Sequence, residues 1–242
     1  MKVDAISNIN EARLEQLVNR TVIVIDVLRA TSSIVVALEN GSSGVMPVKT
    51  VQQAKQAKQE GDLLAGERFC KKISGFDLGN SPTEFLNADL EGRRIILTTT
   101  NGTRVIDKAC KAAFVMAGSF LNAQACAKAA MQLGRDTMII CAGTQDKFSM
   151  EDGLCAGLIA AELDRIAAEQ LFSPPLIFND FAKAMHWSYM HQAGNLKDAL
   201  LHCENGARLT QLGYREDVLY CTNVNQSGIV PVLKDRVMTA LK

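Results

Sequence analysis

The most informative group of side chains is a carboxylate followed closely by an arginine and two hydroxyls. Asp26 ends the apolar run TVIVID, Arg29 comes next, and Thr31 and Ser32 open the following segment. A carboxylate can ligate a hard cation such as Mg²⁺, and an arginine can hold a phosphate through two hydrogen bonds. We therefore expect Asp26 to bind a metal and Arg29 to bind phosphate, with Thr31 and Ser32 on the remaining phosphate oxygens. The alternative is an ion pair beside ordinary helix caps.

A second candidate segment begins with Glu67, which follows another apolar run. Glu67 could be a second metal ligand or a base, and the alternative is a solvated loop acid. Downstream, Ser81 and Glu84 fit a capping box at the start of a helix. Asn80 and its flanking glycines have no such explanation, which suggests close approach of the backbone to a ligand. We expect Asn80 and Ser81 to bind substrate.

A third segment combines hydroxyls with a turn into a helix. Thr99 and Thr100 end a predicted strand, and Asn101, Gly102 and Thr103 lead into a helix. Glycine at such a turn leaves backbone N–H groups open to an anion, so we expect all five residues to bind substrate. Neither GxxxxGK[ST] nor GxGxxG occurs, so a nucleotide site has little support.

A fourth segment supplies a third acid. Asp152 is explained by a capping box with Ser149, but it could equally complete a magnesium site as a ligand. Glu151 in the same first turn suits the helix dipole. Cys141 at a strand end is expected to be a buried structural thiol, since no histidine can be assigned to it as a partner. The histidines lack HExxH spacing, which disfavours zinc.

Alternating apolar runs and helical stretches must position these residues. Such alternation predicts a largely parallel sheet covered by helices. Ligands of open α/β sheets bind at the carboxyl ends of the strands, where the four segments fall. The predicted strands cover 2–6, 21–27, 44–48, 62–65, 93–99, 113–117, 137–141, 218–221 and 229–233. The predicted helices cover 31–39, 50–61, 119–134, 151–170, 181–191 and 196–212, with further helices starting near 81 and 102.

Bulk properties narrow the class of protein. The length of 242 residues suits one α/β domain over 1–242, and the alternative is two sub-lobes with a boundary near 172–176. Lys plus Arg and Asp plus Glu each number 26, so nothing favours nucleic acid as a partner.

No apolar run is long enough for a membrane span. Asp4 lies where a secretory signal would be apolar, and the odd cysteine count without CxxC fits reduced thiols, so we expect a cytoplasmic protein. A homodimer is left open.

Taken together, the segments resemble the 2-phosphosulfolactate phosphatase family. The matching stretches are VIDVLRATSS, GER with GFDLGNSPTEF, LTTTNGT, CAG with EDGLCAG, and GYREDVLYC. The resemblance covers most of the chain in order. It implies a three-layer α/β/α fold and Mg²⁺-dependent hydrolysis of 2-phospho-3-sulfolactate to sulfolactate, a step that leads to coenzyme M in some organisms.

The expected mechanism is direct attack on phosphorus by a magnesium-oriented water. Asp26 is the first expected metal ligand, with Glu67 and Asp152 as further candidates, and Arg29 and the helix N-termini would stabilise phosphoryl charge. The rival is an aspartyl-phosphate on Asp26. Its usual DxD pattern would need a second Asp where this chain has Leu28.

Three other readings remain as alternatives. The chain could act on a different phosphorylated hydroxy acid, bind a small anion without catalysis, or be a nucleotide-dependent transferase. For the sulfonate and carboxylate of the proposed substrate, the expected cationic candidates are Arg68, Lys71, Lys72 and Arg104. Their alternative role is as solvated surface charges.

Overall fold

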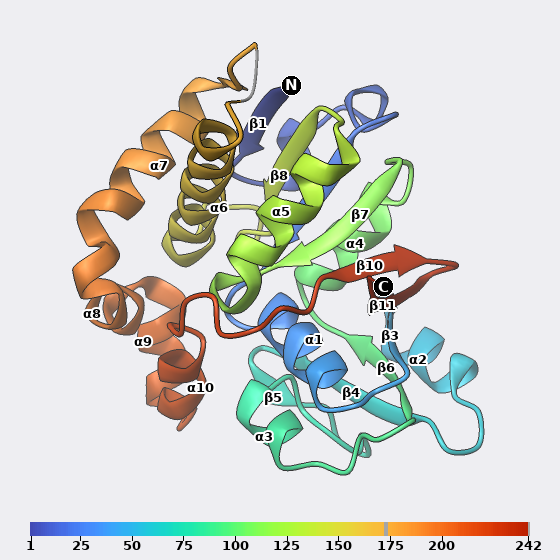
Figure 1. Cartoon of the computed structure of the whole chain (residues 1–242). Helices are drawn as coiled ribbons and strands as arrows, with labels where there is room; N and C mark the ends of the chain where they lie inside the picture. Colours follow the sequence, from blue (N-terminus) through green and yellow to red (C-terminus); the bar gives the residue numbers. More distant parts are fainter. Residues whose placement is uncertain (172–173, 242) are drawn as a thin grey trace.

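The protein is described by a computed structural model that covers residues 1–171 and 174–241. Strands and helices alternate along the chain as far as α6, and helices dominate after it (Figure 1). The strands are β1 (Lys2–Ile6), β2 (Thr21–Ile25), β3 (Gly44–Pro47), β4 (Leu63–Arg68), β5 (Lys71–Lys72), β6 (Arg94–Thr98), β7 (Phe114–Gly118), β8 (Thr137–Cys141), β9 (Ile177–Phe178), β10 (Pro231–Lys234) and β11 (Val237–Ala240). The helices are α1 (Ala30–Glu39), α2 (Val51–Ala57), α3 (Pro82–Leu86), α4 (Gly102–Ala109), α5 (Ala123–Leu133), α6 (Met150–Glu169), α7 (Asp180–Gln192), α8 (Leu196–His202), α9 (Glu204–Gln211) and α10 (Arg215–Tyr220).

All strands belong to one mixed sheet with the order β5-β4-β6-β3-β11-β10-β7-β2-β8-β1-β9. Strands β7, β2, β8, β1 and β9 are mutually parallel and form what we call the large arm. Strands β3, β6 and β4 are also mutually parallel and, with the short β5, form the small arm. The antiparallel hairpin β10–β11 joins the arms and pairs antiparallel with both β7 and β3. The sheet is parallel within most of each arm and mixed as a whole, which confirms the expected α/β fold class with a mostly parallel or mixed sheet.

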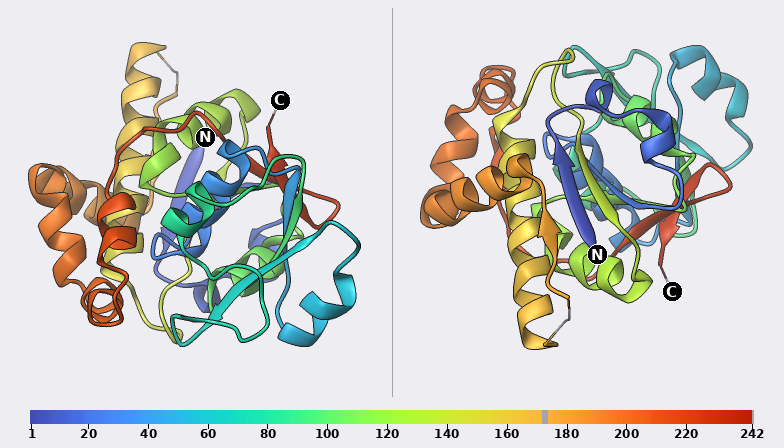
Figure 2. Two further views of the ribbon diagram at one scale, coloured as in Figure 1. Left: turned by 90° about the horizontal axis from the view of Figure 1, so that it is seen from below. Right: turned by 90° about the horizontal axis from the view of Figure 1, so that it is seen from above.

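Helices cover the sheet on both sides, as expected for a three-layer α/β/α fold. On one face of the large arm, inward residues such as Ile23 and Ile139 pack against α5 and α6. On the other face, Val22 and Val24 share a core with α1, α4 and strands of the small arm. Helix α1 contacts β3, β7, β10 and β11, so it lies between the two arms, and α2 covers the outer face of the small arm (Figure 2). Successive strand residues point to opposite faces of a sheet. Because helices cover both faces of β2, all five of its residues are buried.

The C-terminal third departs most from the sequence expectations. Residues 218–221 were expected to form a strand, but Val218 lies in helix α10. The expected single helix over 196–212 is broken at Cys203, where the backbone is extended and the Cys203 sulfur accepts a hydrogen bond from the Gly206 N–H. Close packing of Gly206 on the Leu200 carbonyl leaves no room for a side chain there. Tertiary contacts of this kind override local propensity.

The sequence also failed to indicate strands β5, β9 and β11. Strand β11 follows a two-residue turn in which Asp235 and Arg236 both have positive φ. Such a turn is the usual link of a tight hairpin, but it normally carries Asn-Gly or Asp-Gly, and this chain has neither glycine nor asparagine there. By contrast, the helix expected from residue 50 does begin there, with a capping box in which Thr50 and Gln53 form reciprocal hydrogen bonds.

The alternative of two sub-lobes meeting near 172–176 falls partly outside the described residues, since 172 and 173 are not among them. The single-domain expectation stays a prediction. Within the described part of the chain, no helix is both long and apolar enough to cross a membrane.

Candidate active site

A cavity lies where loops from both arms meet helix α9. Its lining includes seven residues expected to do chemistry, namely Asp26, Arg29, Glu67, Asn80, Thr99, Thr100 and Asn101. The remaining lining residues are Leu28, Phe69, Cys70, Thr144, Gln145, Asn205, Arg208 and Leu209. The structure therefore brings the first three sequence segments to one place.

Asp26 follows β2 and is buried, with 8% of its surface exposed. Its Oδ1 accepts a hydrogen bond from the Ala30 N–H at 3.1 Å, at the start of α1. A Cβ at Gly102 would lie 2.6 Å from the Asp26 Oδ2, so the glycine makes room for this carboxylate. Burial raises the pKa of Asp26 to about 7; the Ala30 amide opposes this shift, and the nearby Glu67 and Glu151 add to it. Asp26 is thus an acid that holds a proton near neutral pH.

The hydroxyls expected beside Asp26 serve the backbone instead of lining the cavity. The Thr31 hydroxyl accepts from the Asp26 N–H at 3.0 Å and donates to the Asp26 carbonyl at 2.9 Å. The Ser32 hydroxyl donates to the Val27 carbonyl at 2.8 Å. Thr103 is tied in the same way to Thr99, donating to its carbonyl at 3.2 Å. Thr31, Ser32, Gly102 and Thr103 thus shape the loops that carry the lining residues.

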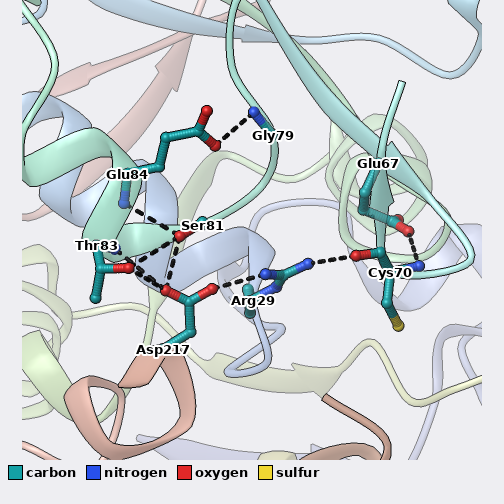
Figure 3. Close-up of polar contacts among 8 residues, drawn as sticks. All are labelled: Arg29, Glu67, Cys70, Gly79, Ser81, Thr83, Glu84 and Asp217. Atoms are coloured by element: carbon teal, nitrogen blue, oxygen red, sulfur yellow. Dashed lines mark hydrogen bonds and ion pairs between the residues drawn. The ribbon is translucent and has the colours of Figure 1, made fainter. Parts of the chain in front are cut away.

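Arg29 is held by two hydrogen-bonded contacts, drawn in Figure 3, and by one stacking contact. Its Nη1 donates to Asp217 Oδ2 at 2.7 Å, and its Nη2 donates to the Cys70 carbonyl at 2.9 Å. The guanidinium also stacks on Tyr214, 4.3 Å from the ring centre. The exposed fractions of the Arg29 and Asp217 side chains are 3% and 1%. Arg29 does form an ion pair, but with the distant Asp217 and not with Asp26 of its own segment, and this pair fixes the orientation of an arginine that lines the cavity.

Asp217 organises a second layer of hydrogen bonds behind Arg29. Its Oδ1 accepts from the Ser81 hydroxyl at 2.7 Å and the Thr83 hydroxyl at 2.6 Å (Figure 3). Ser81 also caps α3 by accepting from the Glu84 N–H. The Glu84 carboxylate accepts from the Gly79 N–H, so the expected reciprocal capping box is incomplete. Ser81 therefore contacts the site through Asp217 and does not line the cavity itself.

Glu67 joins two loops at the carboxyl ends of β4 and β6. Its Oε1 accepts from the Thr100 N–H at 2.7 Å and from the Thr100 hydroxyl at 2.8 Å. Its Oε2 accepts from the Cys70 N–H at 2.7 Å (Figure 3). Only 7% of Glu67 is exposed, so the alternative of a solvated loop acid is wrong.

Asn80 carries an oxygen without a hydrogen-bond partner. Its Oδ1 is buried and accepts no hydrogen bond from any residue that the structure describes, although Asn80 lines the cavity. Leaving such an atom unsatisfied costs about 1–3 kcal/mol. An unsatisfied amide oxygen beside two carboxylates is a donor set that suits a hard cation.

Asp152 lies behind the cavity and binds backbone. Its Oδ1 accepts from the Val27 N–H at 2.8 Å and its Oδ2 from the Gly143 N–H at 3.0 Å. Burial, then the charges of Glu151 and Asp26, raise the pKa of Asp152 well above its usual value. The expected capping box with Ser149 is wrong, because Ser149 makes no capping hydrogen bond.

Across residues 1–171 and 174–241, no three His, Cys, Asp or Glu side chains form a group able to hold a metal, so Asp26, Glu67 and Asp152 are not assembled as a three-acid site.

Cys141 is fully buried at the end of β8. Burial raises the pKa of its thiol well above the usual value, with the neighbouring acids adding to the shift. A thiol with a raised pKa in an apolar setting is a poor nucleophile. Cys141 therefore fits the expected role of a buried structural thiol.

Sequence reasoning missed the contribution of the C-terminal helices. Asn205 and Arg208 reach the cavity from α9, and Asp217 reaches Arg29 from α10. No spacing in the sequence indicates that these helices approach the strand ends. The one available signal was the stretch GYREDVLYC, which carries Asp217 and belonged to the resemblance.

The buried charged groups around the cavity are mostly acidic. Arg29 is the only lysine or arginine that is buried among residues 1–171 and 174–241. The buried carboxylic acids around it are Asp26, Glu67, Glu151, Asp152 and Asp217. Burying several like charges is unfavourable unless protons or a cation offset them. The cavity is therefore suited to bind a cation together with an anion.

Comparisons with known proteins identify the family of the chain. The family described as 2-phosphosulpholactate phosphatase matches residues 7–236. A probable 2-phosphosulfolactate phosphatase of Caldanaerobacter subterraneus is 40% identical over 236 residues, covering 96% of this chain and 94% of that protein. Proteins of the same description from Thermotoga maritima (41% over 221 residues, 90% of this chain and 91% of that one) and Clostridium acetobutylicum (37% over 235 residues, 96% and 97%) are also similar. The chain belongs to the 2-phosphosulfolactate phosphatase family.

Proposed function

We propose that this protein is a magnesium-dependent phosphatase that hydrolyses 2-phospho-3-sulfolactate, or a closely related small phosphorylated acid, to the hydroxy acid and phosphate. Membership of this family makes the chain a phosphoric monoester hydrolase. The observation that carries the magnesium part is the acidic cavity containing Asp26, Glu67 and the unsatisfied Asn80 Oδ1. Sulfolactate released in the cytoplasm could then serve coenzyme M synthesis where that route exists.

The donor set fits magnesium better than a softer ion. Asp26, Glu67 and Asn80 offer oxygen atoms, and Mg²⁺ is usually held by one or two carboxylates together with water and substrate phosphate. Magnesium, when bound, supplies charge neutralisation and an oriented water. A site with two carboxylates and one amide needs no third acid, which agrees with the position of Asp152 behind the cavity.

The chain's own residues have distinct roles in the proposed reaction. Water adds to phosphorus while the bond from phosphorus to the substrate oxygen breaks, and a proton must reach the leaving alkoxide. The attacking water supplies this proton as it adds to phosphorus. Asp26 holds a proton near neutral pH in the metal-free protein, and it would lose that proton on binding magnesium. Arg29, fixed by Asp217, is placed to bind phosphoryl oxygens. Leu28 lines the cavity without a carboxylate, which disfavours the aspartyl-phosphate rival.

A non-catalytic anion-binding protein is the second candidate. It is disfavoured by the buried acids in and around the cavity, which would repel an anion unless a cation accompanied it. Such a protein would bind substrate and product without turnover.

The decisive experiment is phosphate release from phosphosulfolactate, phospholactate and phosphoglycerates. We expect turnover of phosphosulfolactate with Mg²⁺, its loss after treatment with EDTA, and its recovery on adding Mg²⁺ but not on adding Zn²⁺. Full activity in metal-free protein would exclude the magnesium role. Binding of phosphosulfolactate without any phosphate release would favour the anion-binding alternative.

A further inference from the structure

The proposed substrate carries a sulfonate in addition to its phosphate, and the cations expected to bind it are already engaged. Arg68 donates to the Glu67 carbonyl at 2.7 Å and to the Thr98 hydroxyl at 2.9 Å. Arg104 pairs with Asp146 at 3.1 Å and does not line the cavity. Neither arginine lines the cavity, and Arg68 instead borders the neighbouring groove.

The two expected lysines are no better placed. Lys72 donates to the Asp77 carbonyl at 2.6 Å and pairs with Glu84 at 3.3 Å. Lys71 is exposed on the neighbouring surface groove and is not part of the cavity lining. A different cationic side chain is therefore needed to bind the sulfonate.

Arg208 differs from these four residues because it lines the cavity itself. It lines the cavity together with Asn205 and Leu209, and it also borders the groove that contains Phe69. Its side chain is half-buried, and no carboxylate of the described residues lies within ion-pair distance of it. By contrast, the charge of Arg29 is already balanced by Asp217 at 2.7 Å.

The helix that carries Arg208 is firmly attached to the site. One turn earlier, Asn205 donates to Glu151 Oε1 at 2.6 Å and to the Thr144 hydroxyl at 2.5 Å. At its start, Gly206 packs against the Leu200 carbonyl and its N–H is capped by Cys203. These contacts hold α9 in position, so Arg208 is presented to the cavity from a fixed backbone.

We propose that Arg208 binds the sulfonate of the substrate and so determines specificity, an inference that rests on the proposed phosphatase function. A guanidinium can make paired hydrogen bonds to two oxygens of a tetrahedral anion, which a lysine cannot. With phosphate near Arg29, Asp26 and Glu67, the sulfonate lies toward Arg208 at the rim shared with the groove. Discrimination from phospholactate, which lacks the sulfonate, then depends on this one cation.

The test compares kinetics of Arg208→Gln and Arg208→Lys on phosphosulfolactate and phospholactate. We expect Arg208→Gln to lower the ratio of the two kcat/KM values by about 10- to 100-fold, the size of one lost charge-assisted contact. The change should come mainly from a higher KM for phosphosulfolactate, and Arg208→Lys should recover only part of it. Arg165→Gln is the matched control, because Arg165 is on the outside of α6 and pairs with Glu162 and Glu169.

Titration of sulfolactate by calorimetry adds a readout that does not need turnover. We expect the wild type and Arg165→Gln to bind it and Arg208→Gln to bind at least about 10-fold more weakly. Equal losses for both substrates, or unchanged sulfolactate binding, would show that Arg208 does not bind the sulfonate while leaving the phosphatase function intact. If the wild type releases no phosphate from either substrate, the proposed function is wrong, and the titration still decides whether Arg208 binds a sulfonate.

Discussion

At the residue scale, the site contains several carboxylic acids whose charged forms are destabilised by burial. Asp26 is the clearest case, since burial and neighbouring carboxylates raise its pKa from 3.8 to about 7. A pKa that is higher in the folded state means that the folded state binds the proton more tightly. The stability that this proton contributes is complete below about pH 3.8 and is lost as the pH rises through about 7. A loss of stability on ionisation of a buried residue is typical of a position that is retained for function.

The variant Asp26→Asn tests both the loss of stability caused by the buried charge and the role of Asp26 in catalysis. The amide keeps an oxygen for the Ala30 N–H but carries no charge, so we expect turnover to fall at least about 100-fold. In EDTA at pH 8, the metal-free variant should melt at a higher temperature than the wild type, by roughly 2–4 °C for each kcal/mol relieved. The difference should shrink toward pH 4. Circular dichroism melts at both pH values and phosphate-release assays measure these effects.

Three outcomes would change this account of Asp26. Wild-type turnover in Asp26→Asn would make the residue structural. A variant that is less stable than the wild type at pH 8 would show that the carboxylate stabilises the metal-free fold. Isolation of a phosphorylated Asp26 would keep the residue catalytic but replace water attack with the aspartyl-phosphate route.

At the element scale, the cavity depends on contacts between segments far apart in the chain. Asp217 on α10 links Arg29 after β2 to Ser81 and Thr83 at the start of α3. Buried ion pairs are strongly destabilised when one partner is removed, because the other charge is left without compensation. Helix α10 therefore positions Arg29 without itself lining the cavity.

Asp217→Asn should separate this positioning role from simple packing. The variant keeps the size of the side chain but leaves Arg29 without its counter-charge, so we expect a loss of about 3 kcal/mol in unfolding free energy. We also expect a higher KM, because Arg29 no longer has a fixed orientation. Val218→Ala is the matched control on the same helix; its buried side chain contributes packing alone. If both variants change KM equally, Asp217 acts only through stability.

The sequence anticipated the strand-end acids but not the helices that complete the site. Asp26 and Glu67 were predictable because each polar residue ends a continuous apolar run, which marks a buried strand and its exit. Arg208 and Asp217 were not, because their positions depend on how α9 and α10 pack against α3 and the loops. Residues 218–221 even favoured a strand by composition. Local patterns report which face is apolar, and they do not report which helix reaches which loop.

At the scale of the whole molecule, the site needs both arms of the sheet. Asp26 follows a strand of the large arm, whereas Glu67 and Thr100 come from the small arm. The arms are joined through the C-terminal hairpin β10–β11, and α1 is packed between them. The relative placement of the acids therefore depends on residues near the end of the chain.

Met238→Ala in β11 tests whether the two arms form one cooperative unit. Met238 is fully buried and pairs with Val45 of the small arm, so its truncation should cost about 2–5 kcal/mol. If the fold is one domain, hydrogen exchange should show equal losses of protection at Ile23 in the large arm and Ile96 in the small arm. Leu241→Ala, at a partly exposed position next to β11, is the control and should change neither. Loss of protection at Ile96 with Ile23 unaffected would show that the arms unfold separately, and the prediction of a single domain over 1–242 would then be wrong.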